Sequence, residues 1–176
     1  MSNNLDNEIK KQLSLIKGKL FRYIGRAGDL VWLGFGKDVV FKNYRGIERK
    51  TAQYSLHIQC PFRISCNGKK KIGSGDMYET NSITRRSSDF NQDETNTNIY
   101  DEKALILTQE LKHFDVTVIN IESNEMGDVQ IYLSNNCVIE IFTDTSVESE
   151  EWRFFETGTE KEHFVITGKG LDNKAL

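Results

Sequence analysis

The segment from Tyr54 to Cys66, YSLHIQCPFRISC, constrains the fold of this chain more than any other stretch. Its even positions are all apolar or aromatic, and its odd positions are polar or hold Pro61. Strict alternation with a period of two is typical of a β-strand that buries one face and leaves the other open. We therefore expect a strand whose buried face carries Cys60 and Cys66. Pro61 lacks a backbone N–H and predicts a sheet edge or a bulge at that point.

Apolar residues spaced three and four apart predict two helices. The first would bury the stripe Leu5, Ile9, Leu13, Ile16 and Leu20. Asn3, Asn4 or Asp6 is expected to cap its start, and Gly18 to end it. Asp101 is expected to cap a second helix in the centre of the chain. The buried stripe of that helix would consist of Ala104, Leu107, Leu111 and Phe114.

Short apolar runs predict further strands. They lie at residues 29–36, 39–41, 115–121, 129–133, 137–142, 152–155 and 163–167. Ser134-Asn135-Asn136 is expected to form a hairpin turn, because Asn tolerates left-handed backbone angles. About eight strands, with an N-terminal and a central helix, predict an α+β fold of mostly antiparallel sheet.

The 176 residues suit a single domain, residues 1–176. Residues 80–98 are almost entirely polar, and we expect them to form a mobile loop. Residues 1–71 carry 15 Lys or Arg against 5 Asp or Glu, whereas residues 72–176 carry 8 against 21. This split indicates either a basic patch with an acidic tail, or two halves that interleave in one fold. Interleaving is favoured, because strands distant in sequence usually pair inside a small domain.

Three cysteines without the spacing of a disulfide framework predict free thiols in a reducing compartment. The first residues lack the apolar run of a signal peptide. No segment holds the roughly 20 apolar residues that span a bilayer. A cytoplasmic protein without membrane contact is therefore expected.

The open face of the predicted Tyr54–Cys66 strand is the main candidate for a binding site. Ser55, His57, Gln59 and Arg63 would project from it together. A His and an Arg on an open sheet face can hold an anionic ligand or the carboxylate of a partner. The alternatives are a solvated face, or a histidine bonded beneath the 80–98 loop.

Other groups of reactive residues lack the spacing that their chemistry needs. His57 and Cys60 have an H-x-x-C spacing, but on a strand they face opposite sides, so they are not expected to bind metal. Residues 73–76, GSGD, lack the spacing of a phosphate-binding loop and are better explained by a turn. The carboxylates within residues 140–151 are expected to be solvated. The sequence thus predicts no catalytic residue, no metal site and no cofactor.

Nucleic-acid binding would need the basic residues of the N-terminal half to form one continuous positive patch. That patch would comprise Lys42, Arg45, Arg49, Lys50, Lys69, Lys70 and Lys71. Because the two halves are expected to interleave, nucleic acid is not the expected partner.

Three local patterns together resemble an uncharacterised group of small bacterial proteins. They are LHIQCPFRI at 56–64, IGSGDMY at 72–78 and the run 140–166 that contains EWRFF and HFVI. VWLGFG at 31–36 fits the same group. No activity and no catalytic residue can be transferred from this group to the chain. In size and composition such α+β proteins are similar to immunity proteins, which bind and neutralise a toxin.

We expect a non-enzymatic protein-binding module, with toxin neutralisation as its most specific form. The reasons are the absence of a catalytic motif, the long polar loop at 80–98 and the acidic C-terminal half, since acidic surfaces commonly meet basic partners. The alternative is a small-ligand binder or an enzyme that uses the face of His57, Gln59 and Arg63. The sequence does not specify the oligomeric state.

Overall fold

The computed structural model describes residues 4–81, 91, 94 and 96–172. This part of the chain contains the helices α1 (Leu5–Leu13) and α2 (Ile99–His113) and the 3₁₀ turns η1 (Ser14–Ile16) and η2 (Ser74–Tyr78). Its strands are β1 (Phe21–Ala27), β2 (Leu30–Lys42), β3 (Glu48–Ile58), β4 (Phe62–Cys66), β5 (Lys69–Gly73), β6 (Val118–Ser123), β7 (Val129–Leu133), β8 (Cys137–Ile141), β9 (Glu150–Glu156), β10 (Phe164–Thr167) and β11 (Gly170–Leu171). Neither of these helices is long and apolar enough to cross a membrane.

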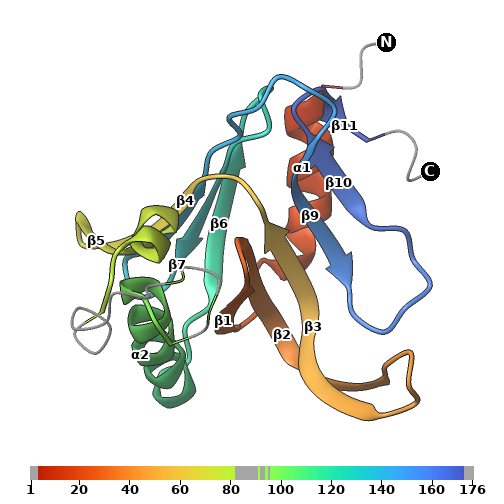
Figure 1. The fold of residues 1–176 in the computed structure, drawn as a ribbon. Helices are drawn as coiled ribbons and strands as arrows, with labels where there is room; N and C mark the ends of the chain where they lie inside the picture. Colours follow the sequence, from red (N-terminus) through yellow and green to blue (C-terminus); the bar gives the residue numbers. More distant parts are fainter. Residues whose placement is uncertain (1–3, 82–90, 92–93, 95, 173–176) are drawn as a thin grey trace.

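The strands form two sheets (Figure 1). The larger sheet has the order β1-β2-β3-β9-β10-β11, and the smaller sheet has the order β5-β4-β8-β7-β6. Every pair of neighbouring strands in these two orders is antiparallel. The predicted α+β class with mostly antiparallel sheet and an N-terminal and a central helix is therefore confirmed. The halves of the chain interleave as expected, because β3 pairs with β9 and β4 pairs with β8.

The Tyr54–Cys66 segment passes from one sheet to the other. Its first part is β3 in the larger sheet and its last part is β4 in the smaller sheet, so the expectation of one continuous strand is wrong. The break falls at Gln59, Cys60 and Pro61, where the missing N–H of proline suits the end of a ladder. The alternation nevertheless continues across the break, and Ile58, Cys60 and Phe62 are all buried. The segment therefore turns a corner while it keeps the same face toward the core.

A second stretch of chain turns the same corner beside the first. β8 pairs with β4 and β9 pairs with β3, so residues 137–156 follow residues 54–66 from one sheet into the other. Two backbone bonds join the stretches at the bend: the Gln59 N–H donates to the Glu151 carbonyl, and the Phe142 N–H donates to the Pro61 carbonyl. Strands that switch sheets in this way build the corners of orthogonally packed sheets.

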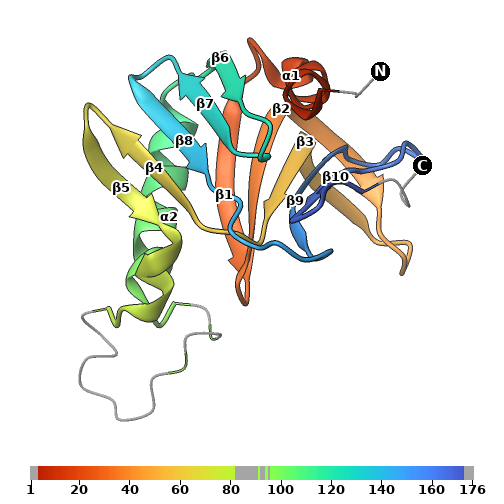
Figure 2. The ribbon, with the colours of Figure 1, turned by 90° about the horizontal axis from the view of Figure 1, so that it is seen from above.

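The far edges of the two sheets also meet. The Phe21 N–H donates to the Val116 carbonyl, and the Val118 N–H donates to the Lys19 carbonyl. The sheets thus wrap around one core, which includes residues of both sheets and both helices. Figure 2 shows the smaller sheet and the larger sheet side by side, with α1 next to β6 and α2 behind β4 and β5.

The N-terminal helix follows its predicted pattern only in part, because α1 ends at Leu13 and η1 ends at Ile16, so Leu20 lies beyond the helix in a bridge with Thr117. Asn4 caps it by accepting a hydrogen bond from the Asn7 N–H, and Ile9, Leu13 and Ile16 are fully buried. Gly18 follows with φ +76°, a conformation that glycine adopts at little cost.

The central helix begins earlier than its predicted cap. Asn98 is the cap and accepts from the Asp101 N–H, so the assignment of Asp101 as the cap is wrong. Ala104, Leu107 and Leu111 are buried as predicted. Phe114 is 68% exposed, because it follows the last helical turn and leaves the buried stripe.

Two predicted connections have different outcomes. Ser134-Asn135-Asn136 joins β7 to β8, and Asn136 has φ +59°, so the hairpin turn is confirmed. The prediction of a mobile loop at 80–98 falls mostly on residues 82–90, 92–93 and 95, which lie outside the described residues. At the ends of this segment, Thr80 and Asn98 form an antiparallel bridge.

Cys66 and Cys137 form a disulfide, so the prediction of free thiols is wrong for these two residues. They occupy directly opposed positions on β4 and β8, with Cα atoms 4.0 Å apart. The sequence showed no framework spacing because the partners lie 71 residues apart. Cys60 remains a free, buried thiol, and burial raises its pKa far above the ordinary value.

The disulfide should contribute about 4 kcal/mol to the free energy of unfolding, because it closes a long loop in the unfolded chain. Denaturant unfolding of the oxidised protein with and without dithiothreitol measures this difference. A Cys60→Ala variant should show the same difference, which assigns the effect to Cys66 and Cys137. Thiol counting after unfolding without reductant should give one reactive thiol per chain, and three would contradict the disulfide.

A buried ion pair ties α2 to the larger sheet. The guanidinium of Arg26 on β1 donates two hydrogen bonds to the carboxylate of Asp101, at 2.6 and 2.7 Å. Their side chains are only 2% and 10% exposed. Arg26 also donates to the carbonyls of Gly28 and Glu94, so one side chain joins the strand, a turn and the segment before α2.

Arg26→Met should lower the free energy of unfolding by about 3–5 kcal/mol, because it leaves the Asp101 carboxylate buried without its cation. Arg22→Met is the matched control on the same strand. Arg22 pairs with Asp38 near the surface, and its loss should cost about 1 kcal/mol or less. Equal losses for the two variants, measured by denaturant unfolding, would contradict the structural role of the buried pair.

Candidate functional site

The structure divides the four predicted site residues between two sheets. Ser55 and His57 lie on β3 in the larger sheet, and Arg63 lies on β4 in the smaller sheet. Gln59 lies exposed at the corner between them. The expectation that the four side chains project together is wrong, because it assumed a strand that stays in one sheet.

Arg63 is occupied by another residue. Its guanidinium donates to both carboxylate oxygens of Glu140 on β8, at 2.5 and 2.8 Å, and it lies over the ring of Phe142. The hydrogen bond from Arg63 lowers the pKa of the Glu140 carboxyl below its ordinary value. Arg63 therefore belongs to a polar network on the smaller sheet rather than to a site with His57.

His57 instead lies among aromatic side chains on the larger sheet, on the face opposite the core. Phe155 on β9 and His57 form a T-shaped ring contact, with ring centroids 4.9 Å apart. His163 stacks on Phe155 at 4.1 Å and 8° between planes, and Trp32 on β2 lies 6.5 Å from His57. We call Tyr23, Trp32, His57, Phe155 and His163 the aromatic face.

The aromatic face borders a cleft of about 370 Å³ that is open to solvent. Ser55 and Thr51 of β3 lie in its lining, together with Phe41 of β2, Glu156 at the end of β9 and residues 157–159 after it. Gly158 closes one side, where its backbone packs against Phe41. The cleft is thus a depression in a sheet surface, walled by one loop.

Both histidines of the aromatic face favour the neutral form. Burial lowers the pKa of His57 below its ordinary value of 6.5, and the nearby charge of Arg153 lowers it further. Burial and Arg153 act in the same direction on the pKa of His163. Arg153 itself is bound by the carboxylate of Glu150. Near neutral pH the face therefore presents uncharged rings.

The lowered pKa of His57 predicts a loss of stability in acid. Below about pH 6.5 the unfolded chain takes up a proton at His57 while the folded chain does not, so the free energy of unfolding falls as pH falls toward the folded pKa. NMR titration of the His57 ring should give a midpoint below 6.5. His57→Gln should flatten the pH dependence of stability in this range, and an unchanged slope would contradict the prediction.

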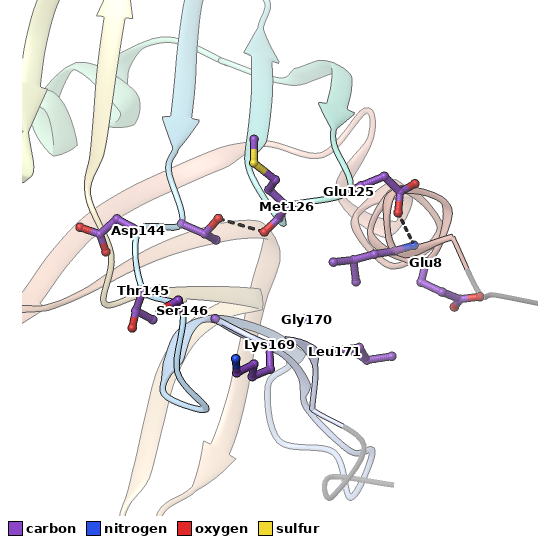
Figure 3. Close-up of a pocket in the computed structure, with 12 residues that line it drawn as sticks. Glu8, Glu125, Met126, Asp144, Thr145, Ser146, Lys169, Gly170 and Leu171 are labelled. Carbon is purple, nitrogen blue, oxygen red and sulfur yellow. Dashed lines mark hydrogen bonds between the residues drawn. The ribbon is translucent and has the colours of Figure 1, made fainter.

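A second hollow, of about 960 Å³, lies where four distant segments meet (Figure 3). They are the first turn of α1, the β6–β7 turn, the segment after β8 and the β10–β11 turn. We call this hollow the acidic groove, because Glu8, Glu125 and Asp144 lie in its lining, and Lys169 is the one basic residue among the described residues that line it. Glu125 faces the helix, and its carboxylate accepts from the Leu5 N–H at 3.2 Å.

Internal bonds hold the wall of the acidic groove in place. The buried carboxylate of Glu151 accepts from the backbone N–H groups of Asp144 and Thr145, at 3.1 and 2.7 Å. The carboxylate of Asp128 accepts from both the N–H and the hydroxyl of Thr143. The segment after β8 is therefore fixed by carboxylates that point inward, while the Asp144 side chain remains exposed.

The other sequence candidates do not assemble into a reactive site. His57 faces outward and Cys60 is buried in the core, as their strand positions predict. Residues 73–76 lead into the 3₁₀ turn η2, where the Asp76 carboxylate accepts from the Gly73 N–H and binds Lys103. Among the described residues, no group of three or more His, Cys, Asp or Glu side chains could hold a metal ion.

The basic residues form two separate groups. The first group lies at the end of the β2–β3 hairpin, which extends beyond the neighbouring strands of the larger sheet, and consists of Lys42, Arg45, Arg49 and Lys50. Lys69, Lys70 and Lys71 lie on β5, at the outer edge of the smaller sheet. Figures 1 and 2 both place these groups at opposite sides of the molecule, so they do not form the continuous patch that nucleic-acid binding would need.

Comparison with known proteins finds no matching family model, no matching curated protein and no matching solved structure. Function must therefore be inferred from the geometry of this chain. Sequence reasoning found His57 and Ser55, but it only placed Trp32 and Phe155 within the predicted strands at 29–36 and 152–155. In the structure, Trp32 lies opposite Gly25 and Tyr23 lies opposite Gly34. This pairing of aromatic residues with glycines would have indicated the site, but it depends on the strand register, which the sequence does not give.

Proposed function

We propose that this chain is a non-enzymatic protein-binding module that receives a basic partner in the acidic groove. One observation carries the proposal: segments far apart in sequence converge on a hollow of about 960 Å³ and bring three carboxylates to it. Such a concave surface with an excess of negative charge attracts a positively charged partner and favours rapid association.

The groove also offers apolar contacts, which a stable interface needs in addition to charge. Met126 lies in the lining and is 69% exposed, and Leu5 and Leu171 line the groove as well. Val147 is exposed on the segment that forms one wall. An apolar anchor surrounded by carboxylates suits a partner that presents an apolar side chain among lysines or arginines.

Toxin neutralisation is the most specific form of this proposal. A toxin that acts on nucleic acid needs a basic surface for its substrate, and an acidic groove that covers this surface would block it. We propose the cytoplasm as the place of action, where such a toxin would meet its target. There Cys66 and Cys137 would be held reduced, so the fold would have to persist without the disulfide.

Co-expression with toxin genes encoded beside this gene tests the proposal. The wild-type protein should restore growth with one of them, and purified complexes should weaken as salt rises. The double variant Glu8→Lys with Asp144→Lys should lose binding by about tenfold or more and fail to restore growth. The matched control is Glu102→Lys on the exposed side of α2, at the other side of the molecule, which should behave as wild type.

Two outcomes would contradict the proposal in different ways. If no neighbouring toxin is neutralised, the toxin-binding role is wrong. If a toxin is neutralised equally by the wild type and the double variant, the binding role stands and the acidic groove is the wrong surface. Thermal unfolding of each variant separates loss of binding from loss of folding.

A further inference from the structure

The aromatic face contains two rings that lie flat on the sheet. Gly25 is directly opposite Trp32 across β1 and β2, and Gly34 is directly opposite Tyr23. A Cβ added at Gly25 would lie 2.6 Å from Cε2 of Trp32, and one added at Gly34 would lie 2.7 Å from Cε1 of Tyr23. The absence of a side chain at each glycine therefore allows the opposite ring to pack directly on the backbone. As a result, the ring covers the backbone on one side and turns its other side outward.

Hydrogen bonds and neighbours fix these rings. The Tyr23 hydroxyl and the Thr51 hydroxyl lie 2.5 Å apart and share a hydrogen bond, and Tyr23 also accepts from the Ala52 N–H. His57 lies next to Trp32, and Phe155 holds His57 from its other side. The aromatic face is thus a preorganised surface, so a ligand that stacks on it would lose little free energy to ordering of the protein.

The cleft over the aromatic face has a distinctive polar composition. Among the described residues that line it, none is a lysine or an arginine. Its polar groups are hydroxyls, among them those of Ser55 and Thr157, two imidazoles and the carboxylate of Glu156. Glu156 is held at the rim by Lys161 and Gln53. The lining suits a neutral ligand that carries many hydroxyl groups around an apolar face.

We propose that the aromatic face binds an uncharged sugar ring, stacked on Trp32 within the cleft of about 370 Å³. The C–H bonds on one face of a pyranose carry partial positive charge, and the face of an aromatic ring is negative. The hydroxyls at the edge of the sugar would exchange hydrogen bonds with the carboxylate, hydroxyl and imidazole groups around it. The cleft volume lies at the lower end of the range for ligand pockets, which fits one or two sugar units.

The sequence suggested, as an alternative function, a small-ligand site at His57, Gln59 and Arg63 that would hold an anion. The present proposal keeps His57 in the site but assigns an uncharged ligand to it. Gln59 and Arg63 lie elsewhere. Two cations lie beside the cleft, Arg153 and Lys161, but the carboxylates of Glu150 and Glu156 already bind them, so neither is left for a phosphate or a carboxylate. A nucleotide is therefore disfavoured. A neutral planar heterocycle would also stack on Trp32. It would use few of the hydroxyl groups, which is why the sugar is the occupant that we choose.

Binding of neutral oligosaccharides to the full chain tests the proposal. The probes are maltotriose, cellotriose and chitotriose, with adenosine as the planar heterocycle. Calorimetry and the fluorescence of the partly exposed Trp32 measure their binding. At least one trisaccharide should bind, and adenosine should bind more weakly. Trp32→Ala should weaken binding by about tenfold or more, while Trp32→Phe, which keeps a flat ring, should restore most of it.

A second variant tests the role of the glycine. Gly25→Ala keeps the Trp32 side chain but fills the space beneath its ring, so the ring must move. The variant should therefore weaken saccharide binding although it removes no group that contacts the ligand. Phe114→Ala is the control, because Phe114 is an exposed aromatic residue that follows α2 and does not line the cleft. Unfolding curves identify any variant that fails to fold, and the comparison of Trp32→Ala with Trp32→Phe remains decisive in that case.

Three results would overturn the proposal: no trisaccharide binds, adenosine binds more tightly than every trisaccharide, or Trp32→Ala leaves saccharide binding unchanged. The outcome is independent of the proposed protein partner. Glu8→Lys with Asp144→Lys should leave saccharide binding intact, and Trp32→Ala should leave toxin neutralisation intact. Failure of one proposal therefore does not imply failure of the other.

Discussion

The antiparallel pair that carries residues 54–66 and 137–156 around the corner between the two sheets is the constraint on which the rest of the structure depends. Two backbone hydrogen bonds close the bend, one from Gln59 to Glu151 and one from Phe142 to Pro61. Because residues 54–66 keep their alternation through the bend, Ile58, Cys60 and Phe62 fill one core instead of two. Helix packing and the positions of both candidate sites follow from this shared corner.

Much of this fold could be predicted from local patterns. Period-two alternation located the buried residues of the Tyr54–Cys66 segment, and helical spacing located α1 and the buried side of α2. What local patterns cannot give is pairing at long range. The disulfide joins cysteines 71 residues apart, and Arg26 finds Asp101 across a similar distance. Asp101 has the side chain of a helix cap, but this ion pair uses its carboxylate, and Asn98 supplies the cap.

The candidate sites show the same division between local and distant information. The alternation correctly turned His57 away from the core, since that depends only on its position in a strand. Its neighbours could not be predicted, because Trp32, Phe155 and His163 come from other strands or from the end of one. Arg63 was grouped with His57 through sequence spacing alone. The change of sheet at Pro61 separates them, and Glu140 on β8 becomes the partner of Arg63.

The corner also explains why the aromatic face and the acidic groove are separate surfaces. A chain that passes from β8 to β9 around the bend needs a connecting segment, and residues 142–149 supply it. Glu151 at the start of β9 fixes that segment from inside, so the exposed carboxylate of Asp144 is displayed as part of the groove wall. The remainder of β9 continues into the larger sheet and places Phe155 beside His57 on the face opposite the core. One strand therefore supports both surfaces through residues that point in different directions, so a charge change at the groove can leave the aromatic rings undisturbed.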